Sequence, residues 1–224
     1  MKYAFLVVFA LTFAQCGQEV HETAKAPTAW YLQNRKPLIT KPYLELPLGS
    51  IQPSGWLKDQ LLRMASGLTG NLDSIYPEVV GPRNGWLGGD GDGWERGPYW
   101  IDGLLPLAYI LDDEGLKRKA QHWVEWTLTH QREDGYIGPV PFLEEPEPEP
   151  GLQRGMREDW WPKMVMLKVL QQYYTATGDA RVIDCLTKYF RYQLQELPQR
   201  PLDFLTLWAR SEERRVGKEC RSRW

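Results

Sequence analysis

The sequence predicts an all-α fold built of helical hairpins, and two observations support this prediction. Apolar residues recur at the spacing of one helix face in segments that begin near residues 55, 101, 116, 162 and 180. Residues 109–131 and 174–196 also repeat one plan 65 residues apart: a helix end, an acidic or glycine turn and a longer amphipathic helix. Repeated helical hairpins are typical of a toroid or a solenoid, in which each hairpin buries its apolar face only against its neighbours.

The first helix is expected from about Gly55, with Ser54 as its N-cap. Gly67 and Gly70 are expected to end it, because glycine is typical of helix C-termini. Residues 71–86 are then expected to form a loop. The apolar face of this helix consists of Leu57, Leu61, Met64, Ala65 and Leu68.

Two helical hairpins are expected after this loop. The first has a helix from Ile101, a tight turn at residues 112–115 and a helix with Leu116, Ala120, Trp123, Val124, Thr127 and Leu128 on one side. The second begins near Pro162, breaks at Gly178 and resumes with Asp179 as N-cap. Its two faces carry Met166, Val169, Leu170, Tyr173 and Thr177, then Val182, Leu186, Tyr189, Phe190, Gln193, Leu194 and Leu197.

The most distinctive stretch is residues 88–109, where a glycine-rich loop with carboxylates and indoles opens onto a helix. Carboxylates accept hydrogen bonds from hydroxyl groups, and aromatic faces cover the apolar C–H surfaces of sugars. A second group of such residues precedes the helix near Pro162. The substrate-binding candidates are therefore Asp92, Trp94, Glu95, Tyr99, Trp100, Asp102, Asp159 and Trp160.

Each of these residues also has a structural interpretation. Asp102 and Asp159 would cap the helices that they precede, and Glu95 would pair with Arg96 or Arg157. Trp100 continues an apolar helix face, which favours a core position for it. The choice between structural and ligand-binding roles stays open, because functional and structural carboxylates look alike in sequence.

Charge and cysteine content exclude several classes of protein. The chain has 27 basic and 29 acidic side chains, which gives no indication of a nucleic-acid partner. Of its three cysteines, only Cys185 lies away from both ends, on an apolar helix face, where we expect it to fill the core. No disulfide, metal site or cofactor is expected within this chain.

The two ends of the chain differ from the domain between them. Residues 1–14 resemble a secretory signal peptide, with Lys2 followed by an apolar run, so the protein is expected to be exported to the periplasm or extracellular space without a stable membrane span. Lipid anchoring at Cys16 is less favoured, because Gln15 is not the small residue that lipoprotein signals require. Residues 15–45 are interpreted as an extended lead-in, and residues 46–209 as the domain. Residues 210–224 resemble the translation of a sequencing-library adapter and are interpreted as read-through.

Four segments resemble glycoside hydrolase family 127, the β-L-arabinofuranosidase-like group. They are residues 94–104 (WERGPYWIDGL), 131–137 (QREDGYI), 158–162 (EDWWP) and 173–179 (YYTATGD). The resemblance covers the N-terminal portion of that family's catalytic domain, and implies an incomplete (α/α)6 toroid that binds a sugar at its mouth.

The resemblance also implies chemistry that this chain does not carry. Arabinofuranosidases of the family are described as using a zinc-held cysteine nucleophile and a glutamate acid/base, which belong to a later part of the domain; zinc is therefore possible only in the full-length protein. The chain departs from the family pattern at residues 159–164 (DWWPKM), where those members bring a histidine to the sugar. This departure leaves the sugar specificity open.

The favoured function is that of a fragment of a secreted glycoside hydrolase acting on plant or microbial polysaccharide or oligosaccharide, with an arabinofuranosidase-like exo-enzyme as one form. The alternatives are a non-catalytic carbohydrate-binding toroid, or another toroidal sugar enzyme such as an unsaturated-uronyl hydrolase or a polysaccharide lyase. The chain as written is expected to be inactive and poorly stable, because half a toroid leaves apolar helix faces open to water. The sequence does not indicate an oligomeric state.

Overall fold

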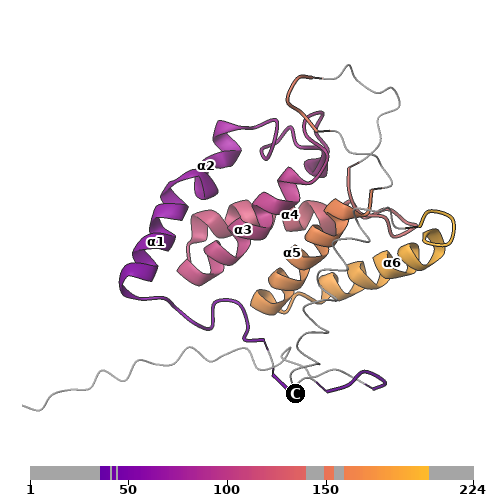
Figure 1. Cartoon of the computed structure of the whole chain (residues 1–224), viewed down its shortest axis with the longest axis horizontal. Helices are drawn as coiled ribbons and strands as arrows, with labels where there is room; N and C mark the ends of the chain where they lie inside the picture. Colours follow the sequence, from indigo (N-terminus) through magenta and orange to yellow (C-terminus); the bar gives the residue numbers. More distant parts are fainter. Residues whose placement is uncertain (1–35, 41, 44, 140–148, 154–158, 202–224) are drawn as a thin grey trace, which may run out of the picture.

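The computed structural model describes residues 36–40, 42–43, 45–139, 149–153 and 159–201, and within them the chain is helical without any strand (Figure 1). The elements are α1 (Gly55–Ser66), α2 (Leu68–Ile75), the 3-10 helix η1 (Gly85–Leu87), α3 (Arg96–Leu111), α4 (Glu114–Thr129), α5 (Trp161–Thr177) and α6 (Ala180–Glu196). The all-α prediction is therefore confirmed. The expected signal peptide, Cys16 and residues 210–224 lie outside the described residues.

The repeat of two helical hairpins is also confirmed. Helices α3 and α5 begin 65 residues apart, at Arg96 and Trp161, and each is followed closely by its antiparallel partner, α4 or α6. Helices α3 and α5 pack along one another in parallel, because Trp94 hydrogen-bonds Asp159 at their N-terminal ends and Asp102 contacts Lys168 further along both helices. The hairpins thus stand side by side, as in an array of helical hairpins.

Both hairpins turn by the same local chemistry. Asp112 and Gly178 adopt left-handed backbone conformations, with φ of 55° and 71°, and the following aspartates cap the next helix. Asp113 Oδ1 accepts the N–H of Leu116 at 2.9 Å, and Asp179 Oδ1 accepts the N–H of Arg181 at 3.0 Å. Each cap satisfies an N–H group that the first helical turn leaves without a partner.

The core lies where the two hairpins meet, and its residues are those at helical spacing in the sequence. The apolar faces expected for α4 and α5 are buried, apart from the partly exposed Leu128 and Thr177. Cys185 is also buried, as expected. The residues with no exposed surface are Ile101, Leu104, Leu105, Ala108, Val124, Met166, Val169, Leu170 and Val182.

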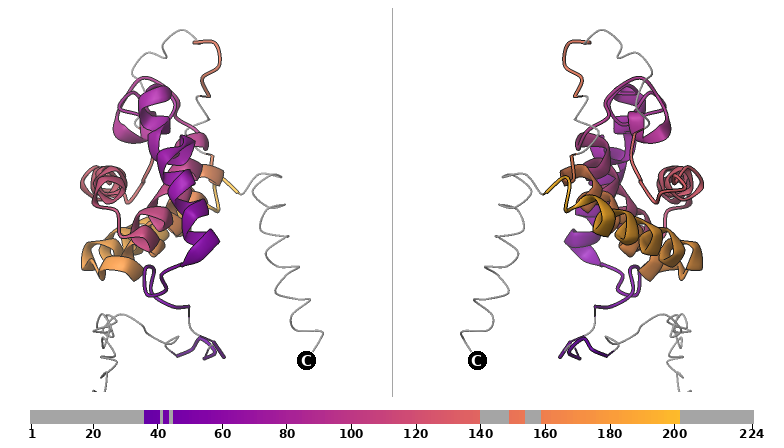
Figure 2. Two further views of the ribbon diagram at one scale, coloured as in Figure 1. Left: turned by 90° about the vertical axis from the view of Figure 1, so that its left-hand side faces the viewer. Right: turned by 90° about the vertical axis from the view of Figure 1, so that its right-hand side faces the viewer.

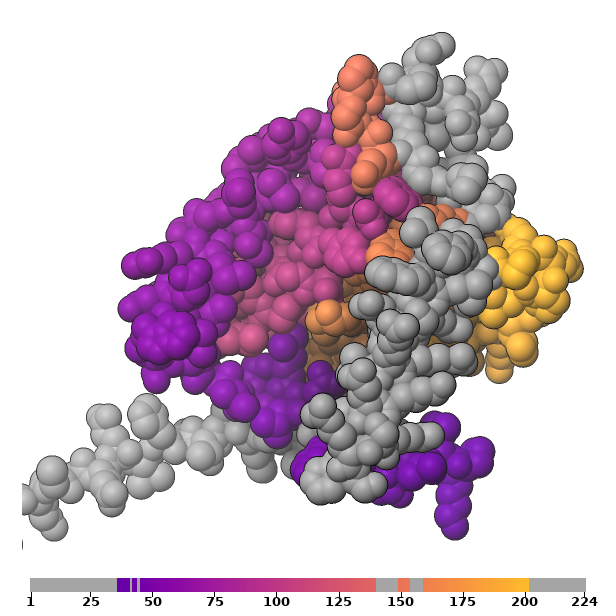
Figure 3. Space-filling model, in the orientation of Figure 1, coloured from indigo at the N-terminus to yellow at the C-terminus, as the bar shows by residue number. Residues whose placement is uncertain are grey.

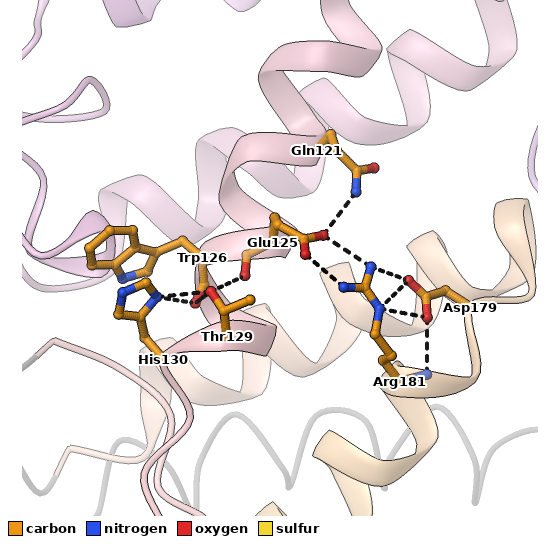
Figure 4. A network of polar contacts seen from close by, with 7 residues as sticks. All are labelled: Gln121, Glu125, Trp126, Thr129, His130, Asp179 and Arg181. Atoms are coloured by element: carbon orange, nitrogen blue, oxygen red, sulfur yellow. Dashed lines mark hydrogen bonds and ion pairs between the residues drawn. The ribbon is translucent and has the colours of Figure 1, made fainter.

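An ionic cluster joins the outer helices α4 and α6. The Arg181 guanidinium donates to Glu125 Oε1 and Oε2 at 2.6 and 3.0 Å and also to the carboxylate of Asp179, as Figure 4 shows. Arg181 lowers the pKa values of Glu125 and Asp179 through these hydrogen bonds. Close by on α4, the His130 ring stacks on Trp126 with 3.6 Å between ring centroids. The cluster fixes the end of α6 against α4.

The expectation that residues 71–86 form a loop is wrong in two places. Helix α2 occupies Leu68–Ile75, and η1 occupies Gly85–Leu87. Gly70 does not end a helix but lies inside α2, where a Cβ atom would come within 1.8 Å of the carbonyl oxygen of Ala65. Glycine is required there for close approach of α2 to the end of α1, rather than for chain termination.

Two other sequence expectations need correction. Helix α3 begins at Arg96 instead of Ile101, because Gly97 and Pro98 are buried in a helical first turn. The buried face of α6 is rotated from the expected one: Cys185 and Tyr192 point inward, whereas Phe190 and Leu194 are exposed. The expected face of α6 required a neighbour on the side of Phe190, and none is present among the described residues.

The described array has two open edges. Figure 1 shows α1 and α2 along one edge and α6 along the other, and the two side views of Figure 2 bring each edge to the front. Figure 3 shows the same order on the molecular surface. Helix α1 has no buried residue, and Trp56 is 79% exposed. In the part of the chain that the structure describes, no helix combines the length and apolar character needed to cross a membrane.

Candidate functional site

The mouth of the array consists of the N-terminal ends of α3 and α5 with residues 88–95 and 149–153. Trp94, just before α3, donates its indole N–H to the carboxylate of Asp159, just before α5. Asp159 Oδ1 also accepts the N–H of Trp161 at 2.9 Å, so its capping role is confirmed. One carboxylate thus both begins α5 and fixes an indole of the neighbouring hairpin.

Asp92 is completely buried and organises the glycine-rich loop. Its Oδ2 accepts hydrogen bonds from Arg96 Nε at 2.8 Å and from the N–H of Gln153 at 2.9 Å, and its Oδ1 accepts the N–H of Trp94 at 3.3 Å. A buried carboxylate needs such partners, because burying an unpaired charge is costly. These contacts give Asp92 a structural role in place of the open ligand-binding position expected from the sequence.

Residues 149–153 are fastened to this loop by two arginines. Arg83 donates to Asp90 and to Glu149, each at 2.9 Å, and Arg96 donates to the carbonyl of Gly151 at 2.7 Å. Figure 3 shows this segment lying against the loop that precedes α3. The mouth is therefore built from segments more than 50 residues apart in the sequence.

A hollow of about 550 Å³, the mouth hollow, opens beside these helix ends. Tyr99 and Asp102 of α3 lie on one side, Trp161 and Lys168 of α5 form its wall, and Phe190 of α6 lies at its far end. Its volume is within the range of small-molecule sites, and aromatic walls with a few polar groups are typical of them.

Asp102 lies inside α3, so the expectation that it caps a helix is wrong. Its carboxylate accepts hydrogen bonds from Lys168 Nζ at 2.8 Å and from Gln172 Nε2 at 3.1 Å, and its side chain is 17% exposed. Asp102 thus links the two inner helices while lining the mouth hollow.

Glu95 differs from the other two carboxylates at the mouth. It is partly buried and has no hydrogen bond or ion pair from its side chain within the described ranges, since Arg96 pairs with Asp92 instead. Arg157, its other expected partner, lies outside those ranges. Burial raises the pKa of Tyr99, and the negative charge of Glu95 raises it further. Glu95 therefore remains the least engaged carboxylate near the hollow.

Trp100 and Trp160 are core residues. Trp100 packs edge-on against Trp123, with ring centroids 5.9 Å apart, and donates to the carbonyl of Thr69 at 3.0 Å. Trp160 is 4% exposed and donates to the carbonyl of Arg200 at 3.3 Å. The structure brings Trp94, Tyr99, Asp102 and Asp159 together at the mouth, with Glu95 near Tyr99. Contact of these residues with a substrate stays a prediction.

The sequence interpretation missed Trp161 and Lys168, which line the mouth hollow with Tyr99 and Asp102. The repeat itself contained the signal. Lys168 follows Asp102 by 66 residues, and parallel neighbours at the repeat spacing are expected to face each other.

The described residues do not fit the zinc site that the resemblance implies for arabinofuranosidases. They contain no group of three or more His, Cys, Asp or Glu side chains able to hold a metal ion. Burial raises the pKa of the Cys185 thiol to about 11, whereas a zinc ligand must be a thiolate. We derive no metal-assisted step from this chain.

The fold and the mouth define a class of protein: an all-α array of helical hairpins with an aromatic and acidic rim, suited to saccharides. The chain belongs to the family described as Beta-L-arabinofuranosidase, GH127 catalytic domain, whose family model matches residues 48–203. This membership supports a glycoside hydrolase, arabinofuranosidase-like by resemblance. No curated protein and no solved structure matched the chain significantly.

Proposed function

We propose that the chain provides the saccharide-binding mouth of an exported glycoside hydrolase that acts on plant or microbial polysaccharide or oligosaccharide, in the manner of an arabinofuranosidase-like exo-enzyme. In this proposal the sugar lies in the mouth hollow. The indole of Trp94 and the ring of Tyr99 cover its C–H faces, and the carboxylates accept its hydroxyl protons.

The observation that carries the proposal is the convergence of acidic and aromatic side chains from two hairpins at one hollow. Tyr99 and Asp102 from α3 meet Trp161 and Lys168 from α5 there, next to the hydrogen bond between Trp94 and Asp159. A ligand held between two rigid helices is positioned more precisely than one held by a loop, and glycoside cleavage depends on such positioning.

The proposal places the catalytic nucleophile and acid/base outside the described residues. Glycoside hydrolysis needs two carboxyl groups or an equivalent pair on either side of the scissile bond. Asp102 and Asp159 are held by Lys168, Gln172 and Trp94, which suits positioning better than proton transfer. The chain as written is accordingly proposed to be inactive on its own.

The test is an assay of the full-length protein against a panel of aryl glycosides that includes β-L-arabinofuranosides and unsaturated uronides. We expect turnover of one class, and a decrease of kcat/KM by about tenfold or more in Glu95→Gln and Asp102→Asn, because a charged hydrogen-bond acceptor is lost. Asp184→Asn, an exposed change on α6, is the matched control.

Two outcomes would contradict the proposal. Binding of oligosaccharide without turnover of any glycoside would favour a non-catalytic carbohydrate-binding toroid. Turnover that is equally fast in Glu95→Gln, Asp102→Asn and Asp184→Asn would place the sugar away from the mouth hollow.

A further inference from the structure

A second hollow of about 540 Å³ lies between α2, the chain near Val80 and the N-terminal half of α4, and we call it the α2–α4 pocket. It shares no lining residue with the mouth hollow. Trp100, whose neighbour Tyr99 faces the mouth, contributes to this pocket together with Trp123. The two hollows therefore lie on different sides of α3.

The pocket has an apolar floor and a polar rim. Val80, Leu87, Leu116 and the edges of the two indoles form the floor. The titratable groups on the rim are Asp73, Asp113, Arg118, Lys119 and His122. An apolar floor with a few converging polar groups, at this volume, is typical of a site for a small organic molecule.

The two rim carboxylates and Lys119 already have partners. Lys119 Nζ lies 2.7 Å from Asp73 Oδ1 and donates to the carbonyl of Gly70 at 2.8 Å. Asp113 accepts the N–H of Leu116 as the cap of α4. Lys119 and Asp73 cancel each other's charge, and the Asp113 carboxylate is held at the helix terminus, where a negative charge is stabilised.

Arg118 and His122 are the rim groups that remain available. They lie one helical turn apart on α4, both are exposed, and neither side chain has a hydrogen bond or ion pair with any residue in the described part of the chain. Residues four apart on a helix face the same side. The guanidinium of Arg118 and an N–H of the His122 ring can therefore reach one anionic group from the same side.

We propose that the α2–α4 pocket binds a small carboxylate-bearing ligand of the size of a sugar acid, with its carboxylate on Arg118 and His122. The planar guanidinium matches the two oxygens of a carboxylate, and the apolar floor covers the C–H face of the ligand. The proposal does not depend on the function assigned to the mouth hollow.

The experiment is a calorimetric titration of the whole chain with galacturonate at low salt, with galactose as the neutral counterpart. We expect galacturonate to bind and galactose not to bind. Arg118→Gln should weaken binding by about tenfold or more, and His122→Gln by a smaller factor, because charge-assisted hydrogen bonds are lost. Raised salt should weaken binding, since the rim is exposed.

Arg191→Gln is the matched control, because Arg191 is an exposed arginine on α6 and lines neither hollow. Circular dichroism of all variants checks that their helices are intact. The proposal is overturned if galacturonate does not bind, if galactose binds as well, or if Arg118→Gln binds like Arg191→Gln. It is also overturned if Asp102→Asn, at the mouth, abolishes galacturonate binding while Arg118→Gln retains it.

Discussion

The hairpin α3–α4 can be aligned with the hairpin α5–α6 through their N-caps, Asp113 and Asp179, which lie 66 residues apart. In this alignment Trp123 corresponds to Tyr189, and both are buried. Val124 corresponds to Phe190, but Val124 has no exposed surface whereas Phe190 is 53% exposed. The two hairpins share their caps and one buried row of residues, and differ in a second row.

The second row differs because of neighbours, not because of local sequence. Helix α4 contacts α5 and α6 in addition to α3, and α3 also packs against α1 and α2. The outer side of α6 has no such cover within the described ranges. An amphipathic hairpin therefore sets the residues that can be buried, and the array decides which of them are buried.

The largest expected effect tests this difference directly. Val124→Ala removes two methyl groups from a fully buried position and should reduce the free energy of unfolding by about 2 kcal/mol. Phe190→Ala removes a whole ring but should cost less than about 1 kcal/mol, because half of that ring is already in water. Urea unfolding followed by circular dichroism gives both values. Equal costs would mean that a further element covers α6 in solution.

The next effect compares two glycines of α3. A Cβ atom at Gly97 would lie 2.6 Å from the Trp123 ring and 2.8 Å from Asn84 Nδ2, both buried, so Gly97→Ala should destabilise the fold by about 1–3 kcal/mol. At Gly103 a Cβ atom meets nothing within 4 Å, so Gly103→Ala should stabilise the fold by about 0.5–1 kcal/mol.

The same two unfolding curves decide whether α3 is packed as described. A stabilising Gly97→Ala would show that the first turn of α3 is not pressed against α4. A destabilising Gly103→Ala would show that another element covers the middle of α3. The corresponding positions of α5 are Pro162, buried like Gly97, and Lys168, exposed like Gly103.

The sequence was sufficient for the hairpins but not for their environment. Caps such as Asp179 and the turn at Gly178 depend on local chemistry, and they were predicted correctly. The orientation of Phe190 depends on a neighbouring element, and the helical role of Gly70 depends on the approach of α1, so neither follows from periodicity. Tertiary contacts overrode local signals at these positions.

The candidate site was predictable to a similar extent. The sequence indicated Trp94, Tyr99, Asp102 and Asp159, which the structure gathers at the mouth. It could not show that Asp92 is buried within the loop, because an aspartate in a glycine-rich segment looks the same whether it binds a ligand or backbone N–H groups.

A smaller effect concerns the ionic cluster between the outer helices. Arg181→Ala should cost about 1 kcal/mol near neutral pH, because it leaves Glu125 and Asp179 without their shared partner. Both carboxylates have lowered pKa values in the folded state. Their contribution is therefore complete above their ordinary pKa values, near about 4, and is lost as the pH falls through the lowered values.

The measurement is the difference in unfolding free energy between the wild type and Arg181→Ala as a function of pH. The difference should shrink as the solution is made strongly acidic. Lys117→Ala is the comparison in the other hairpin, since Lys117 pairs with Asp112 and Glu114 on its own hairpin only. A pH-independent effect of Arg181→Ala would mean that its alkyl packing, and not its charge, joins α4 to α6.

The smallest expected effect concerns the link between Asp102 and Lys168 across the two hairpins. Lys168 is 61% exposed, so Lys168→Ala should change the unfolding free energy by less than about 1 kcal/mol. A double-mutant cycle with Asp102→Ala should give a coupling energy of similar small size, reduced by salt. Since the packing of α3 on α5 is apolar, this pair orients groups in the mouth hollow without being needed for the fold. A coupling energy of several kcal/mol would instead show that the pair is shielded from water by a further part of the protein, and would identify the mouth hollow as an enclosed site.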